Sequence, residues 1–161
     1  MEDIARAQLR YRRAALQRDA ARADARSCLA DALGELDDAG TYYTLYYPDD
    51  GDRPDWQGGT VPADFSHLDW NALAPSLEVA VEDRSTRRAI LLAEIARRSR
   101  PADTVLVTVG SRSAPQLALA HADFERHCET ILNLGQAALW LSAPSARWLI
   151  ELRPPWVRVA G

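Results

Sequence analysis

The chain opens with a long segment of helix-forming residues. Residues 3–37 contain no proline, and the first glycine among them is Gly34. Ala, Leu, Arg, Gln and Glu dominate this segment, and all of them have high helix propensity. The pattern predicts one long Arg- and Ala-rich helix over residues 1–38. We expect it to end at the turn that leads to Gly40, because glycine is favoured just after a helix.

The apolar side of this predicted helix changes half-way along. At 100° per residue, the apolar residues of the first half gather on one side: Ala5, Leu9, Leu16, Ala20 and Ala23. Those of the second half gather on nearly the opposite side: Ala25, Leu29, Ala32, Leu33 and Leu36. We therefore expect the helix to break near residues 23–26, or to place its two halves against different surfaces.

The length of the predicted helix is itself informative. A straight helix over residues 3–37 would be about 50 Å long, whereas a compact domain of this chain length is only about 40 Å across. One end would project beyond its own domain. A regular coiled coil is not indicated, because Arg12, Asp19 and Arg26 interrupt the apolar pattern. We expect the projecting end to contact a second helix or a second copy of the chain, and thus predict a homodimer through this helix.

Shorter elements follow beyond residue 40. Alternating and β-prone runs predict strands over 42–47, 105–109, 116–120, 137–142, 147–153 and 156–159. Helical periodicity predicts helices over about 84–99 and 123–134 and a helical turn within 64–74. Proline, glycine and aspartate predict an acidic loop over 48–62. This order indicates a single α+β domain over residues 1–161, with a mostly antiparallel sheet of about five to six strands and about three helices.

Two element boundaries depend on particular residues. Asp83 or Ser85 is expected to cap the helix that follows, because both side chains can accept a hydrogen bond from the first helical turn. Pro154 and Pro155 precede the strand predicted over 156–159. Since proline is tolerated at the edge of a sheet, we predict a short edge strand there.

Charge is distributed in blocks along the chain. The 19 basic residues are all arginine and stand against 23 acidic ones, which gives a net charge of −4. Residues 1–30 carry +3, residues 31–83 carry −12, residues 84–112 carry +5, and the remainder balances. The acidic block either solvates a loop or meets a basic partner. It argues against general nucleic-acid binding, which needs a continuous basic footprint.

The absence of lysine excludes several chemistries. Without lysine the chain cannot contain a Walker-type phosphate loop. For the same reason it cannot be a Schiff-base enzyme, a protein kinase or a Ser-x-x-Lys acyltransferase. Cys28 and Cys128 lie far apart without metal-type spacing, which fits a reducing cytosol. The acidic start and the lack of any run of about 18 apolar residues predict a cytoplasmic chain without a membrane contact.

The remaining candidate catalytic residues form no recognisable pattern. The histidines are His67, His121 and His127. His121 and Glu125 lie one helical turn apart but lack a third metal ligand. Cys128 shares the apolar face of its helix, which indicates a buried and unreactive thiol. We therefore predict no metal, no cofactor and no catalytic residue.

Aromatic residues beside aspartates carry the strongest indication of function. The tyrosines of residues 42–47 place two rings on each side of a strand, and one side is expected to be exposed. Exposed aromatic rings are typical of binding hot spots. Tryptophan between carboxylates in a loop is hard to explain by packing alone. We predict a partner-binding surface that consists of Tyr42, Tyr46, Asp49, Asp50, Asp52, Asp55, Trp56, Asp64, Asp69 and Trp70.

Three functional hypotheses follow. The leading one is a non-enzymatic protein-binding module that neutralises a basic partner, by analogy with small acidic inhibitors such as immunity proteins and antitoxins. Complementary charge speeds association, and buried Tyr and Trp anchors slow release. The first alternative is a dimeric nucleic-acid-associated regulator that uses the Arg-rich helices within 6–26 and 84–100. The second is an enzyme whose site the sequence does not specify.

Overall fold

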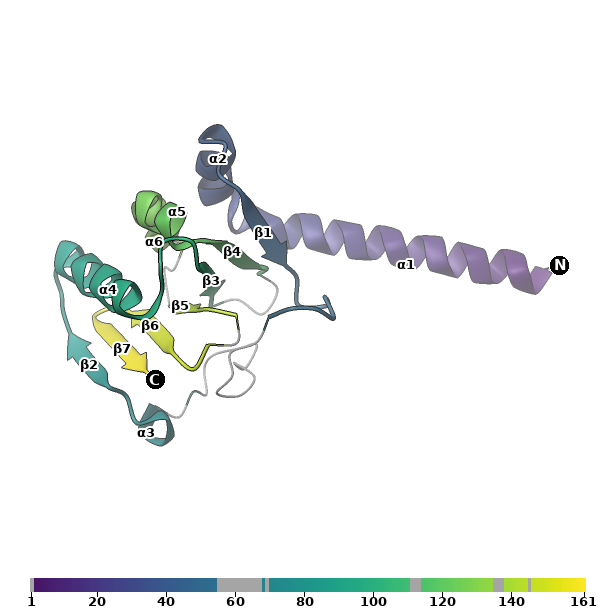
Figure 1. Ribbon diagram of the computed structural model, residues 1–161. Helices are drawn as coiled ribbons and strands as arrows, with labels where there is room; N and C mark the ends of the chain where they lie inside the picture. The colour runs from purple at the N-terminus through teal and green to yellow at the C-terminus, as the bar shows by residue number, and fades with distance from the viewer. Residues whose placement is uncertain (1, 55–67, 69, 111–113, 135–137, 145) are drawn as a thin grey trace.

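The computed structural model describes residues 2–54, 68, 70–110, 114–134, 138–144 and 146–161. Its helices are α1 (Glu2–Ser27), α2 (Ala30–Asp38), α3 (Trp70–Leu73), α4 (Arg84–Arg98), α5 (His121–Arg126) and α6 (Cys128–Asn133). Its strands are β1 (Tyr43–Tyr46), β2 (Leu77–Ala80), β3 (Thr104–Val109), β4 (Gln116–Ala120), β5 (Leu139–Ser142), β6 (Leu149–Arg153) and β7 (Trp156–Ala160). The predicted α+β class is confirmed (Figure 1).

The strands form one sheet in the order β1-β4-β3-β5-β6-β7-β2. Every neighbouring pair is antiparallel, including the predicted β3–β4 hairpin. The seven strands of the described sheet slightly exceed the predicted number, because β2 was not expected. Its four residues are too few for an alternating pattern to stand out in the sequence.

Strand β7 does not lie at an edge of the sheet, so that prediction is wrong. It pairs with β6 on one side and with β2 on the other. Pro154 and Pro155 lie in the turn between β6 and β7, because the last paired residues of the hairpin are Arg153 and Trp156. Neither proline is therefore required to donate a hydrogen bond within the ladder. The edges of the described sheet are β1 and β2.

Helices α2, α4, α5 and α6 cover one face of the sheet (Figure 1). Apolar side chains from these helices, and Leu29 at the start of α2, are buried against it: Leu33, Leu36, Leu91, Ile95, Phe124, Cys128 and Ile131. Alternate strand residues complete this core, among them Val105, Val107, Leu117, Leu141, Ile150 and Val157. Asp83 rather than Ser85 caps α4, since its carboxylate accepts a 2.7 Å hydrogen bond from the Thr86 N–H.

The second face of the sheet carries a smaller apolar cluster. Ala138, Trp140 and Leu149 lie buried there, and Leu68, Trp70 and Leu73 pack against them. Cross-strand neighbours place a row of polar side chains beside this cluster. The row consists of Tyr46, Gln116, Thr108, Glu151, Arg158 and Glu78, with Trp140 between Thr108 and Glu151. Both faces of the sheet are therefore partly covered.

The predicted long N-terminal helix is divided in two. Helix α1 ends at Ser27 and α2 begins at Ala30, so the break lies just beyond the predicted range of residues 23–26. Figure 1 shows α1 extending away from the rest of the molecule, as the length argument predicted. Residues 4–21, which we call the arm, are exposed except for the half-buried Ala15.

Helix α2 ends where the sequence predicted. The backbone of Gly40 has a φ of +63°, which glycine adopts without strain. The Gly40 N–H donates to Asp37 O at 3.0 Å and the Thr41 N–H to Leu36 O at 2.8 Å. These two bonds form a Schellman motif, which supplies hydrogen-bond donors to carbonyls that have no donor within the helix.

The helix predicted over residues 123–134 is interrupted. His127 adopts φ −102° and ψ 16°, which separates α5 from α6. The His127 side chain is buried between other elements, and this tertiary contact competes with a regular helical backbone. In the described parts of the chain, no helix is long and apolar enough to cross a membrane.

Candidate binding surface at the base of the N-terminal helix

The ten predicted site residues do not form one cluster. Four of them lie outside the described residues: Asp55, Trp56, Asp64 and Asp69. Five others follow one another along β1 and the start of the acidic loop, and we call them the β1 patch: Tyr42, Tyr46, Asp49, Asp50 and Asp52. The tenth, Trp70, lies elsewhere on the sheet.

The aromatic part of the β1 patch belongs to an edge strand. Tyr43 and Leu45 pack against the main core, so the alternate positions point the other way. Tyr42 precedes the strand and is 84% exposed, while Tyr46 is half-buried. Of the four tyrosines that the sequence divided between two sides, Tyr43 packs on the core and Tyr42 is exposed, whereas Tyr46 and Tyr47 are both half-buried.

An arginine from the helix holds the acidic part of the patch. Arg22 Nη2 lies 3.0 Å from Asp49 Oδ1 and 2.5 Å from Asp50 Oδ1. The Arg22 guanidinium also stacks on the Tyr47 ring, 4.7 Å from its centroid. These contacts fix the loop against the last turns of α1 and neutralise part of its charge.

The same contacts control the protonation of Asp50. The Tyr47 N–H donates a 2.7 Å hydrogen bond to Asp50 Oδ2. This bond, followed by the bond from Arg22, lowers the pKa of Asp50 below its ordinary value. A shallow groove of about 380 Å³ runs along this junction. It is lined by Arg18, Ala21, Arg22, Ala25, Tyr47, Pro48 and Asp49.

Trp70 occupies a different part of the same sheet face. It is half-buried and packs against Ala138, Trp140 and Leu149. Strands β4 and β3 separate it from the β1 patch. Trp70 thus contributes to the smaller apolar cluster and does not contact the tyrosines with which the sequence grouped it.

The acidic block of residues 31–83 is dispersed by folding. Asp83 caps α4, and Glu78 pairs with Arg158 at 3.4 Å. Glu35 accepts hydrogen bonds from His127 at 2.7 Å and from Thr130. The acidic residues that are concentrated in one segment of the sequence therefore form contacts in several separate parts of the structure.

His127 joins three segments of the chain. Its Nδ1 lies 2.7 Å from Glu35 Oε1 and its Nε2 lies 3.2 Å from Thr41 Oγ1. The hydrogen bond from Thr130, and then the one from His127, lower the pKa of Glu35. The ring is buried, so this contact binds α2 to the α5–α6 junction and leaves no room for a ligand on the imidazole.

A serine, a histidine and a glutamate also meet at the end of α4. His121 Nδ1 lies 3.2 Å from Ser99 Oγ, and His121 Nε2 lies 3.2 Å from Glu125 Oε1. The Ser99 hydroxyl, however, donates its proton to Ile95 O at 3.0 Å. The imidazole therefore does not activate this hydroxyl as a nucleophile, and the contact closes the end of the helix.

The geometry favours neither reactivity of the Cys128 thiol nor a metal centre among the described residues. Cys128 is fully buried, and burial raises the pKa of its thiol to about 11. This agrees with the predicted unreactive thiol. Across the residues that the structure describes, no three His, Cys, Asp or Glu side chains come together in a way that could hold a metal ion.

Sequence reasoning missed the charged ladder on the second face of the sheet. Arg158 Nη1 lies 3.0 Å from Glu151 Oε2, and Arg158 Nε lies 3.4 Å from Glu78 Oε2. The three residues are direct neighbours on β6, β7 and β2. The alternation of Glu151 with apolar residues placed it on the second face, but burial of that face was not expected.

The fold defines this chain as an α+β protein with a seven-stranded antiparallel sheet and helices over one face. No known protein family matches the chain, and comparisons with curated proteins and with solved structures found no similar protein. Its function must therefore be argued from its own surfaces.

Proposed function

We propose that this chain is a non-enzymatic protein-binding module, of the kind that small acidic inhibitors such as immunity proteins and antitoxins represent. The β1 patch is its contact surface, and the partner is a basic protein. The observation that carries the proposal is Tyr42, which is 84% exposed at the start of an edge strand whose other end leads into the acidic loop. Large exposed aromatic side chains at such positions are typical of interface anchors.

Preorganisation supports this choice of surface. Arg22 holds Asp49 and Asp50 against α1, and Tyr47 completes the contact. A loop that is already ordered loses less conformational entropy when a partner binds. Asp49 remains half-exposed despite its ion pair, and Asp52 is exposed, so both carboxylates can face a partner.

The overall charge supports a basic partner. Helix α1 contributes +3 to the net charge of −4, so the rest of the chain carries −7. An acidic body attracts a basic protein over distances of about a Debye length and speeds the encounter. Edge strands also present unpaired backbone groups, which a partner strand can use.

The test is affinity purification of the tagged chain from its native cells, followed by binding kinetics with the recovered partner. We expect a partner with net positive charge. Asp49→Arg with Asp52→Arg should slow association at least tenfold at low salt, and Tyr42→Ser should speed dissociation. Glu82→Arg is the matched control, because Glu82 is exposed and acidic but lies between β2 and α4.

Two results would contradict the proposal. One is that no partner is recovered under conditions in which the chain is folded. The other is that the recovered partner binds the Tyr42 and Asp49/Asp52 variants as well as it binds the Glu82 control.

A second candidate function is supported by the arm. Arg10, Arg12, Arg13 and Arg18 are exposed along a helix that leaves the body of the molecule. A regulator that binds nucleic acid through these residues should show affinity that falls steeply with salt. A flat binding curve with duplex DNA and with RNA at low salt would exclude it.

A further inference from the structure

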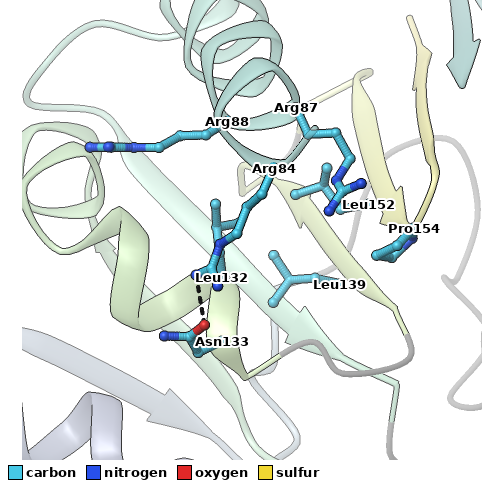
Figure 2. A pocket seen from close by; sticks show the side chains of 8 residues that line it. All are labelled: Arg84, Arg87, Arg88, Leu132, Asn133, Leu139, Leu152 and Pro154. Atoms are coloured by element: carbon cyan, nitrogen blue, oxygen red, sulfur yellow. Dashed lines mark hydrogen bonds between the residues drawn. The ribbon is translucent and has the colours of Figure 1, made fainter. Parts of the chain in front are cut away.

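A pocket of about 250 Å³ lies where the first turn of α4 meets the ends of α6, β5 and β6 (Figure 2). Its apolar side is made by Leu132, Leu139, Leu152 and Pro154. Its polar side is made by Arg84, Arg87, Arg88 and Asn133. The pocket is on the helix-covered face and shares no residue with the β1 patch.

Two of the arginines are held by neighbouring side chains. Arg84 Nη2 donates to Asn133 Oδ1 at 2.6 Å and to Glu129 Oε2 at 3.0 Å. Arg88 Nη1 lies 3.0 Å from Glu129 Oε1, and Figure 2 shows its guanidinium directed away from Arg87. Glu129 is thus a common counter-ion for Arg84 and Arg88.

The third arginine keeps donors available. Arg87 Nη1 donates to the backbone carbonyls of Val81 at 2.7 Å and Glu82 at 2.8 Å, which fixes the position of the guanidinium. Within the described part of the chain, its Nε–H and Nη2–H groups make no hydrogen bond. Figure 2 shows this guanidinium at the rim of the pocket, close to Leu152 and Pro154.

The charge of the pocket is only partly balanced from within, because Glu129 pairs with Arg84 and Arg88 and Asp83 interacts electrostatically with Arg87. Three guanidinium groups surround it, and Glu129 is the carboxylate that contacts two of them. Like charges one helical turn apart repel each other, and three guanidinium groups against two carboxylates leave an excess of positive charge that an additional anion would offset. The apolar side lowers the local dielectric constant and strengthens the attraction for a negative charge.

We propose that this pocket binds a small amphiphilic anion, in which a carboxylate or phosphate group meets Arg87 and Arg84 and a short apolar body lies against Leu132, Leu139 and Leu152. Guanidinium groups bind both head groups with paired hydrogen bonds. The apolar side supplies the hydrophobic contact that most small-molecule sites use. A cavity of about 250 Å³ limits the ligand to a short body.

The first experiment is calorimetric titration of the intact chain with four probes. Hexanoate and hexyl phosphate carry both features, acetate has the head group without the body, and hexanol has the body without the charge. Hexanoate or hexyl phosphate should bind at least tenfold more tightly than acetate and hexanol, because each lacks one of the two contacts. Whichever of the two anions binds more tightly shows whether the pocket prefers a carboxylate or a phosphate head group.

The second experiment uses matched variants. Arg87→Gln should weaken binding of the preferred anion about tenfold or more, and Arg84→Gln should also weaken it, because a bond to a charged group is lost in each case. Arg100→Gln is the control, since Arg100 is exposed and does not line the pocket. Glu129→Gln should strengthen binding, because it removes the internal counter-ion of Arg84 and Arg88.

Several outcomes would overturn the proposal. They are equal affinity for hexanoate and acetate, unchanged binding in both arginine variants, or NMR shift changes that map away from α4 and α6. Thermal unfolding of each variant is measured first. If Arg87→Gln does not fold, the probe series, Arg84→Gln and Glu129→Gln still decide the question.

Discussion

At the scale of single residues, buried polar side chains contribute to stability through the ion pairs that they form. Glu151 is only 2% exposed, and its carboxylate lies 3.0 Å from Arg158 and 3.8 Å from Arg153. Arg158 also contacts Glu78 and lies 5.1 Å from the Trp156 ring. Such a pair adds little net stability relative to apolar residues, and removing Glu151 leaves Glu78 as a carboxylate that still contacts Arg158.

Glu151→Gln should destabilise the fold by about 1.5–3 kcal/mol, the range for a lost hydrogen bond to a charged group, because Arg158 keeps Glu78 as a partner. The change keeps the size of the side chain, so the loss reports on charge. The measurement is the free energy of unfolding from urea titration. Glu82→Gln, at an exposed position, should change it by less than about 0.5 kcal/mol. A similarly small change in Glu151→Gln would contradict the structural role of the pair.

Asp83 gives a prediction for the response to acid. Hydrogen bonds from Ser85 and Thr86 lower the pKa of this capping carboxylate to about 2. Since the folded pKa is below the unfolded one, its stabilisation is complete above about pH 4 and is lost as the pH falls to about 2. Asp83→Asn keeps an acceptor for the Thr86 N–H but does not titrate in this range.

We expect the free energy of unfolding of the natural chain to fall more steeply between about pH 4 and pH 2 than that of Asp83→Asn. Urea titrations at a series of pH values measure both slopes. Parallel slopes would show that Asp83 is not the titrating cap.

At the scale of elements, α1 and α2 are formed by similar sequences with opposite roles. The arm consists of strong helix formers and exposes Leu9 and Leu16, which are 66% and 70% exposed. Helix α2 buries Ala32, Leu33 and Leu36 against the sheet. Local propensity maintains the arm, whereas tertiary packing maintains α2.

Substitutions in the two helices should differ accordingly. Leu33→Ala should destabilise the protein by about 2–5 kcal/mol, as is usual for a buried leucine. Leu9→Ala and Leu16→Ala should leave global stability within about 0.5 kcal/mol of the natural chain. Hydrogen exchange supplies an independent measurement, in which amides of residues 4–18 should exchange much faster than those of α4. Protection of the arm in the isolated chain would show that another surface covers it.

At the scale of the whole molecule, the arm makes the protein elongated and electrically asymmetric. Helix α1 carries +3 and the remainder −7. The arm, which holds most of the arginines of α1, is the part that leaves the body in Figure 1. The two proposed contact surfaces, the β1 patch and the arm, are therefore joined at the base of α1.

This shape is measurable in solution. A compact chain of this length has a radius of gyration of about 15 Å, and small-angle scattering should give a clearly larger value. A chain that begins at residue 21 should return to the compact value and unfold at the same urea concentration. A compact value for the whole chain would mean that the arm folds back, and a doubled mass in light scattering would support the predicted homodimer.

Much of this structure could be predicted from the sequence, because the signals were local. The Gly40 stop, the Asp83 cap and the β3–β4 hairpin depend on neighbouring residues alone. The position of Trp70 could not be predicted, since Ala138, Trp140 and Leu149 are remote from it in sequence. The proposed anion pocket could not be predicted from the sequence either, because tertiary packing brings α4 together with α6 and β6.

The sequence by itself determined the α+β class, the projecting helix and the burial of Cys128, because helix propensity, periodicity and apolar spacing act over a few residues. Only the tertiary structure decided where β7 lies, how α5 and α6 separate at His127, and which charges meet. The acidic block shows the reason: residues 31–83 are contiguous in the chain, but folding sends Glu35 to His127, Asp50 to Arg22 and Glu78 to Arg158. The net charge of a segment can be counted from its sequence alone. The charge that a surface presents depends on which residues, distant in the chain, pair with its charged side chains.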